Sequence, residues 1–153
     1  RIDVLATAIA GSMRVDDLID LELCYAPPYG SAKDPVNLAG MVAQNVCRGL
    51  VKNVNPTSPP VETDALLYLD VRSAVERQLG AIEGSYHIPL DELRGRLHEL
   101  PKETTLVVYC QSGQRSYTAC RILSQNGFTC LNLSGAYLSW SAANEGQRAL
   151  AKS

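Results

Sequence analysis

The sequence predicts an α/β fold with a mostly parallel sheet flanked by helices, preceded by a smaller and mostly helical segment. After a proline-rich stretch near residue 60, short apolar runs alternate with amphipathic helical patterns, which is typical of βαβ units. Before that stretch only helical patterns occur, and about fifty residues of this kind can bury little apolar surface by themselves. We therefore expect a fragment of one domain, joined by a linker to a second domain.

The first segment, residues 1–52, contains two helical patterns. One begins at Ile2 and repeats apolar residues at helical spacing through Ile9. The other begins at Asp34–Pro35, an N-cap followed by a first-turn proline, and ends at Gly49. The stretch between the two patterns contains adjacent prolines and cannot be helical. The second helix is expected to carry one apolar stripe, formed by Leu38, Met41, Val42 and Val46.

Residues 53–61 are predicted to be a linker, because they hold three prolines and no apolar periodicity. The second domain is expected over residues 62–153, with Thr105–Tyr109 as its strongest strand. Ser73 and Glu76 have the spacing of a capping box, which predicts the start of a short helix. Further strands are predicted over residues 66–70, 86–88 and 129–133. Three further helices are predicted: one marked by Leu90, Leu93 and Leu97, one over residues 115–126, and one from about residue 137.

The composition excludes several classes of function. Hydrophobic residues make up 46% of the 153 residues, and the formal net charge is −2 with both signs spread along the chain. This balance argues against nucleic acid or an anionic membrane as the main partner, and no apolar run reaches the length of a membrane span. The odd number of loosely spaced cysteines predicts neither a disulfide framework nor a metal site, and we expect a reducing, cytoplasmic setting.

The loop after the strongest strand contains the candidate catalytic residues. Ligands of parallel α/β folds bind at the carboxyl ends of the strands, so Cys110 stands where a site is expected. Gly113 allows the backbone to turn its N–H groups inward as an anion-binding nest at the start of the next helix. That helix end and Arg115 should lower the pKa of Cys110 and make its sulfur nucleophilic. We predict that Cys110 is catalytic and that its cradle is formed by Gln111, Ser112, Gly113, Gln114, Arg115 and Ser116.

A cysteine at a strand end is more often core filling than a nucleophile, and only the glycine, the arginine and the strand–loop–helix context reverse that interpretation for Cys110. The remaining cysteines lack such a context. They are interpreted as core residues, namely Cys24, Cys47, Cys120 and Cys130.

The order and spacing of several motifs resemble the rhodanese family. These motifs are Leu69–Arg72 followed by Glu76, then Ile88–Leu93, Val108–Ser116, and Leu133–Tyr137 followed by Trp140. The resemblance covers roughly residues 62–145. It implies a rhodanese-like, five-stranded parallel sheet and a persulfide on Cys110 held by the loop amides. It also implies that Asp70 and Arg72 brace the site, with an ordinary ion pair as the open alternative.

The sequence departs from the rhodanese pattern at Gly80–Gly84. The family usually has Gly-His-Ile-Pro-Gly there, and this chain lacks the histidine and the proline. Those two residues are chiefly structural in the family. The departure therefore puts the local packing in question more than the chemistry.

A second resemblance concerns the first segment. Residues 20–37 are similar to the C-terminal end of the dimerisation domain of pyridine nucleotide-disulfide oxidoreductases, in the style of coenzyme A-disulfide and coenzyme A-persulfide reductases. This resemblance covers roughly residues 1–50. It implies a homodimeric parent enzyme with FAD and NAD(P)H, in which Tyr25 reaches the partner subunit's active site or packs at the interface. We expect neither cofactor in this chain, because no G-x-G-x-x-G motif occurs in it.

The sequence is compatible with three functions. The leading hypothesis is a sulfurtransferase, in which Cys110 accepts sulfane sulfur and passes it to a thiol such as coenzyme A. The alternatives are a cysteine-based phosphatase or arsenate reductase, and a non-catalytic docking module. Four residues separate Cys110 from Arg115, one fewer than in cysteine-based phosphatases, and the tighter loop favours a single extra sulfur over a phosphate.

Overall fold

The computed structural model describes residues 1–58 and 66–150, the last five of them by their backbone alone. The chain divides into two compact units, Arg1–Leu50 and Val51–Ser153. Among the described residues, no helix is both long and apolar enough to cross a membrane.

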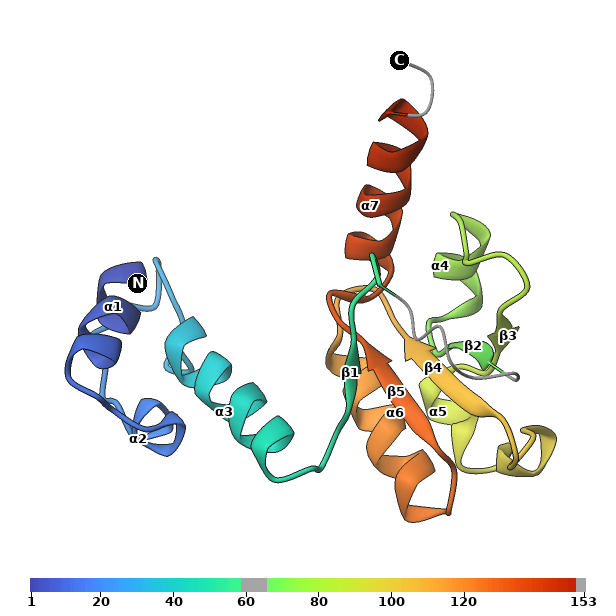
Figure 1. Ribbon diagram of the computed structural model, residues 1–153, viewed down its shortest axis with the longest axis horizontal. Helices are drawn as coiled ribbons and strands as arrows, with labels where there is room; N and C mark the ends of the chain where they lie inside the picture. Colours follow the sequence, from blue (N-terminus) through green and yellow to red (C-terminus); the bar gives the residue numbers. More distant parts are fainter. Residues whose placement is uncertain (59–65, 151–153) are drawn as a thin grey trace. The chain divides into compact units, whose positions relative to one another are not determined.

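The first unit consists of three helices, α1 (Ile2–Ala10), α2 (Val15–Ile19) and α3 (Pro35–Cys47) (Figure 1). The predicted start of α3 is confirmed, because the Asp34 carboxylate accepts a hydrogen bond from the N–H of Val36 at 2.9 Å. The sequence did not indicate α2, which is short and packs against α3. This contact depends on Gly40, where an added Cβ would lie 2.9 Å from the Cβ of Leu18.

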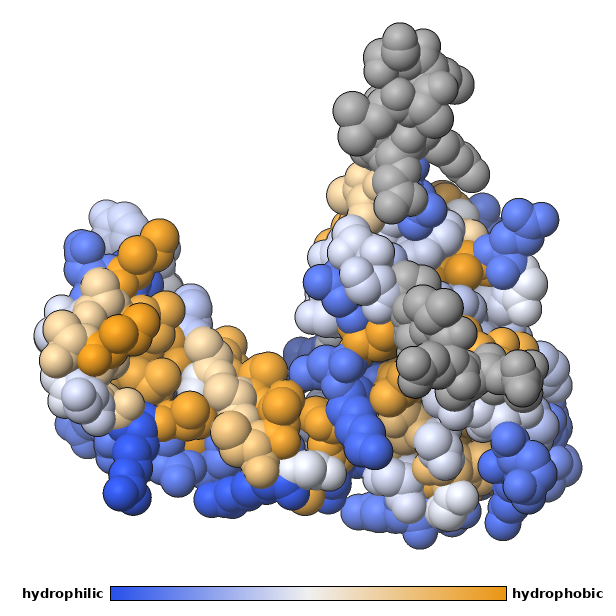
Figure 2. All heavy atoms as spheres, in the orientation of Figure 1, coloured by the Kyte–Doolittle hydropathy of each residue, from blue (hydrophilic) through white to orange (hydrophobic). Residues whose placement is uncertain are grey.

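The first unit leaves much of its apolar surface exposed. The predicted stripe on α3 is apolar, yet the side chains of Leu38, Val42 and Val46 are 44%, 57% and 44% exposed. Figure 2 shows hydrophobic surface gathered over this unit. The core assignment of Cys24 and Cys47 is wrong for this chain, because both are exposed beside such uncovered surface. These features fit a fragment whose packing partners lie elsewhere.

The second unit is built on a five-stranded, all-parallel sheet in the order β1-β5-β4-β2-β3. The central strand β4 is aligned with β2 along its whole length, and its last four residues are fully buried. Such burial is expected of a strand covered on both faces. The strands are β1 (Asn53–Val54), β2 (Leu66–Asp70), β3 (Tyr86–His87), β4 (Thr105–Tyr109) and β5 (Cys130–Leu133).

Strand β1 corrects the predicted linker. Asn53 and Val54 pair with Asn132 and Leu133 of β5, so the sheet begins where residues 53–61 were expected to be a linker. A two-residue edge strand is too short to show any apolar alternation, and its pairing partner lies far along the chain. Residues 59–61 of the predicted linker lie outside the described residues.

The helices of the second unit largely follow the predictions. Helix α6 packs on β4 and β5, and the capping box that opens α4 is present, with Ser73 and Glu76 bonded reciprocally. The single helix expected around Leu90, Leu93 and Leu97 is wrong, because a short α5 is followed by a separate 3₁₀ helix. Gly95, a weak helix former, stands between the two. The bounds are α4 (Ala74–Gln78), α5 (Leu90–Leu93), the 3₁₀ helix (Leu97–Glu99), α6 (Gln114–Gln125) and α7 (Ala136–Leu150).

Candidate active site

Cys110 directly follows the central strand β4, at the edge of the sheet where all five strands end. It is only 1% exposed, so the thiol lies at the bottom of its loop. Gly113 has a φ of 122°, which favours glycine, and this conformation turns its N–H toward the sulfur at 3.1 Å. The predicted nest of amides therefore exists around the Cys110 sulfur.

The environment of Cys110 has opposing effects on its ionisation. Burial raises the pKa of the thiol, but hydrogen bonds from the hydroxyl and backbone of Ser116, and from the N–H groups of Gly113 and Ser112, outweigh burial and lower that pKa overall. The predicted direction is confirmed. These hydrogen-bonding groups lie within the loop and the first turn of α6, where the helix N-terminus also favours an anion.

The Ser116 hydroxyl is a side-chain hydrogen-bond partner of the Cys110 sulfur. The hydroxyl is fully buried, donates to the carbonyl oxygen of Gly113 at 2.9 Å, and lies 3.6 Å from the sulfur, which can donate to it as a thiol. A thiolate can only accept hydrogen bonds. Ionisation would therefore turn the Ser116 proton from the Gly113 carbonyl toward the sulfur.

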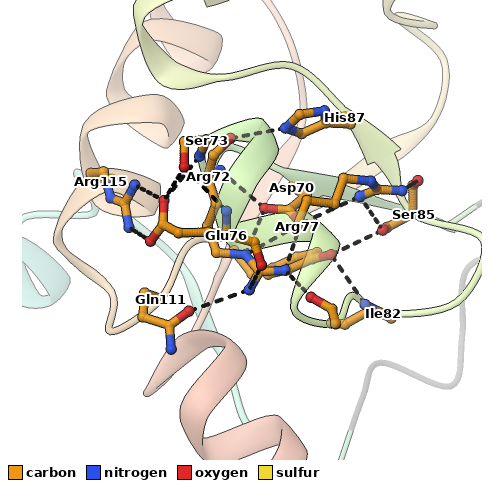
Figure 3. Close-up of polar contacts among 12 residues, drawn as sticks. Asp70, Arg72, Ser73, Glu76, Arg77, Ile82, Ser85, His87, Gln111 and Arg115 are labelled. Carbon is orange, nitrogen blue, oxygen red and sulfur yellow. Dashed lines mark hydrogen bonds and ion pairs between the residues drawn. The ribbon is translucent and has the colours of Figure 1, made fainter.

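Arg115 lies beside the loop but is held by another residue. Its guanidinium forms a bidentate ion pair with Glu76, at 2.7 Å from Nη1 to Oε2 and 2.6 Å from Nη2 to Oε1 (Figure 3). This pairing lowers the pKa of Glu76 to about 2, and Glu76 raises the pKa of Arg115 more than Cys110 does. Arg115 is thus a cation near Cys110 whose charge is largely balanced by Glu76, and its predicted effect on the Cys110 pKa stays a prediction.

Asp70 and Arg72 form a buried ion pair that contacts the loop. Arg72 donates to the Asp70 carboxylate at 2.8 Å from Nη2 and 3.0 Å from Nε, and both side chains are at most 1% exposed. Arg72 also donates to Gln111 Oε1 at 3.3 Å (Figure 3). Its Nη2 donates to the Gly80 carbonyl at 2.7 Å. The sequence thus located two residues that the fold places against the cradle. Their predicted supporting role stays a prediction.

Two tyrosines enclose the Arg72 guanidinium, and site prediction from the sequence missed them. Its Cζ lies 4.2 Å from the ring centroid of Tyr137 and 5.4 Å from that of Tyr109, within the range of cation–π contacts. The backbone N–H of Tyr137 also donates to the Cys110 carbonyl at 3.0 Å. Since Tyr109 precedes Cys110 directly and Tyr137 opens α7, both tie the loop to its surroundings.

The remaining predicted residues differ in their positions. The side chains of Ser112 and Gln114 are exposed, with Ser112 at the rim of the loop and Gln114 in the first turn of α6.

Tyr25 lies in the first unit and is 52% exposed, so its contact with a partner subunit stays a prediction. Cys120 is buried and Cys130 is half-buried, in agreement with core positions. In the described part of the chain, no group of three His, Cys, Asp or Glu residues is arranged to hold a metal ion.

A family model for the rhodanese-like domain matches residues 59–143. The chain belongs to this family. Its rhodanese-like domain is 38% identical over 80 residues to a sulfurtransferase of Allochromatium vinosum, a match that covers 52% of this chain and 75% of the relative. A coenzyme A disulfide reductase of Staphylococcus epidermidis is 52% identical over 44 residues, covering 29% of this chain and 10% of the reductase.

Two solved structures resemble the whole chain. The reduced CoADR-RHD of Bacillus anthracis has a TM-score of 0.87 and 43% identity, and covers 94% of this chain and 26% of its own. A NAD-dependent persulfide reductase from A. fulgidus has a TM-score of 0.79 and 44% identity, covering 92% and 25%. The chain therefore spans about a quarter of the length of these two proteins. It is a rhodanese-like, sulfurtransferase-type domain, with a preceding unit, related to both.

The departure of this rhodanese-like domain from its family pattern lies next to the Arg72 site. Gly80 has a φ of 137°, and an added Cβ would overlap the Tyr137 hydroxyl. Its carbonyl is an acceptor of Arg72. Gly80, the glycine of the family pattern, therefore has a structural role in this chain, although the histidine that usually follows it is absent. Ile82 remains buried in the core, so the local packing survives the change.

Proposed function

We propose that Cys110 accepts sulfane sulfur as a persulfide and passes it to a small-molecule thiol. The observation that carries this proposal is the buried Cys110 sulfur in a nest of N–H groups that lower its pKa. A thiolate that is stabilised at neutral pH is the form that attacks sulfur. The same N–H groups suit the anionic terminal sulfur of a persulfide.

The transfer consists of two displacements at sulfur. The Cys110 thiolate attacks the outer sulfur of the donor, a new S–S bond forms, and the donor's own bond to that sulfur breaks as its leaving group takes the electron pair. An acceptor thiolate then attacks the terminal sulfur on Cys110. This step forms the acceptor persulfide and returns the Cys110 thiolate, so no oxidant or reductant is consumed.

The geometry of the loop favours sulfur over phosphate as the cargo. Four residues separate Cys110 from Arg115, and Glu76 binds both terminal nitrogens of the Arg115 guanidinium. A phosphoryl group needs a guanidinium that is free to bind its oxygens bidentately. A tight ring of amides around one buried sulfur fits a single added atom better. A module kept for docking alone would have no use for such a cradle.

The related structures support a role within a larger enzyme. Both similar reductases are about four times longer than this chain, and the first unit here exposes apolar surface that such an enzyme would cover. In this proposal the parent is a homodimeric coenzyme A-disulfide or persulfide reductase. FAD and NAD(P)H would be bound by its other domains, coenzyme A would be the thiol, and Tyr25 would approach the partner subunit.

Cyanide-dependent thiocyanate release tests the proposed function. We expect the chain to release thiocyanate from thiosulfate or from a low-molecular-weight persulfide, and to hydrolyse an aryl phosphate with a much lower kcat/KM. A preference for the phosphate ester would promote the phosphatase alternative. The absence of both activities, with the fold intact by circular dichroism, would leave the docking module.

A further inference from the structure

The charged side chains around the Cys110 loop form two ion-paired groups, in which Arg72 and Arg77 share the Asp70 carboxylate and Arg115 is paired with Glu76. Arg72 is paired with Asp70 and is shielded from solvent, being 1% exposed. Arg115 has a different position, since its side chain is 38% exposed and its pKa responds to the charge of Cys110. Arg115 is therefore a cation that a negatively charged donor would meet on its way to the sulfur.

Glu76 neutralises that cation. Its two carboxylate oxygens each accept from one Arg115 nitrogen, and its pKa of about 2 keeps it ionised at neutral pH. Glu76 is itself fixed, because Oε2 accepts from the backbone N–H and the hydroxyl of Ser73, each at 3.0 Å. The pair is thus anchored in the capping box of α4, and the approach to Cys110 carries little net charge from it.

The charge at this approach matters differently for different sulfur donors. When the Cys110 thiolate attacks thiosulfate, the outer sulfur is transferred and sulfite leaves, so three negative charges gather at the site. Attack on an alkyl persulfide releases a thiolate and gathers one charge or two, depending on the protonation of the donor. Since like charges in a partly desolvated site repel strongly, a neutralised arginine penalises thiosulfate more than a persulfide.

We propose that Glu76 determines donor selectivity by neutralising Arg115, so that dianionic donors such as thiosulfate are disfavoured relative to persulfides of low charge. This inference rests on the proposed sulfurtransferase function and names its preferred donor class. Glu76 acts through Arg115 and does not touch the donor. It is therefore a specificity-determining residue and takes no part in the chemical step.

The first test is the ratio of kcat/KM for thiosulfate to that for the persulfide of 2-mercaptoethanol, which carries no charge outside its persulfide group. In Glu76→Gln we expect this ratio to rise about threefold to tenfold, because the variant frees the charge of Arg115 while its side-chain oxygen can still accept from Ser73. Glu99→Gln is the matched control. Glu99 is also paired with an arginine and has a pKa of about 2, but it precedes the amino end of β4, at the opposite edge from Cys110. An unchanged or lower ratio in Glu76→Gln overturns the inference.

A second measurement does not require sulfur transfer. The alkylation rate of Cys110 by anionic iodoacetate, divided by the rate with neutral iodoacetamide, reports the charge at the approach. This quotient should rise about twofold to fivefold in Glu76→Gln at low ionic strength, and the gain should shrink in salt. Arg115→Gln should lower the quotient instead, which provides a reading if Glu76→Gln does not fold.

The two measurements separate the two claims. If the unmodified chain transfers sulfur from no donor, the proposed function fails, and the alkylation quotient still decides whether Glu76 neutralises the approach. If sulfur is transferred but neither the donor ratio nor the alkylation quotient changes in Glu76→Gln, the function stands and the role of Glu76 is refuted.

Discussion

At the residue scale, the reactivity of Cys110 depends on a few hydrogen bonds within its own loop. Burial opposes ionisation of the thiol, and the balance is reversed by N–H groups and by one hydroxyl, that of Ser116. These contacts lie within six residues of the sulfur and follow from a glycine at the start of a helix. The position and polarity of the cradle could therefore be predicted from the sequence.

Removal of the Ser116 hydroxyl should weaken the thiolate. In Ser116→Ala we expect the pKa of Cys110 to rise, because a donor to the anionic sulfur is lost from a buried site. Alkylation by iodoacetamide, followed against pH, should shift to higher pH and become several-fold slower at neutral pH. Ser112→Ala is the control, since Ser112 contributes through its backbone N–H, which the substitution keeps. Equal alkylation profiles for the two variants would show that the hydroxyl has no such role.

The buried ion pair of Asp70 and Arg72 should stabilise the folded state as well as contact the Cys110 loop. Asp70→Asn would leave the buried Arg72 without its countercharge, and we expect a loss of about 3 kcal/mol in the free energy of unfolding. Urea unfolding monitored by circular dichroism measures this loss. Asp91→Asn, on the exposed surface of α5, is the matched control and should change little.

The pH dependence of that loss has a definite sign. Burial raises the pKa of the Asp70 carboxyl, but the hydrogen bonds and charge of Arg72, with a hydrogen bond from Tyr109, outweigh burial and lower that pKa in the folded state. The stabilisation by the Asp70 carboxylate is therefore complete above the unfolded-state pKa of about 4, and declines as the pH falls through the lower folded-state pKa. The difference between the wild-type chain and Asp70→Asn should shrink in acid. A difference that is independent of pH would contradict this linkage.

At the scale of elements, the site is assembled by segments that are distant in sequence. The turn after β2 supplies Arg72, helix α4 supplies Glu76, and the loop after β4 supplies Cys110. Tyr137, the second residue of α7, contacts the Arg72 guanidinium and donates its N–H to the Cys110 carbonyl. Strands and helices could be predicted because their apolar periods are local. The Glu76–Arg115 pair spans 39 residues and was not predicted, because no local pattern links the two positions. Strand β1 escaped prediction for the same reason, since its pairing partner is remote.

Gly80 tests how tightly these segments are joined. Gly80→Ala would force a side chain onto a φ of 137° and against the Tyr137 hydroxyl, so we expect a loss of about 2 to 4 kcal/mol in unfolding free energy. Gly84→Ala is a matched control with a φ of 72° and open space around the added Cβ, and it should cost about 1 kcal/mol. Thermal unfolding of both variants provides the comparison. Equal losses would mean that the contact with Tyr137 is unimportant.

At the scale of the whole molecule, the two units differ in how completely they bury their apolar residues. The rhodanese-like unit has a continuous core from Val51 to Ala136, whereas the first unit exposes the stripe of α3. The sequence indicated this contrast, because two patterned helices cannot enclose a core. It did not indicate that Cys24 and Cys47 would be exposed, since a cysteine carries no signal of what covers it.

The exposed cysteines determine how sulfur loading must be measured. Cys24 and Cys47 could also react with a sulfane donor, so a gain in total mass would not identify the carrier. The decisive measurement is peptide mapping by mass spectrometry after treatment with a low-molecular-weight persulfide, followed by a chase with a thiol acceptor. We expect the peptide with Cys110 to gain one sulfur atom and lose it in the chase, and Cys110→Ser to fold normally but support no transfer to the acceptor. Transfer that persists in Cys110→Ser, with the added sulfur on Cys120 or Cys130, would contradict the assignment of Cys110 as the sulfur carrier.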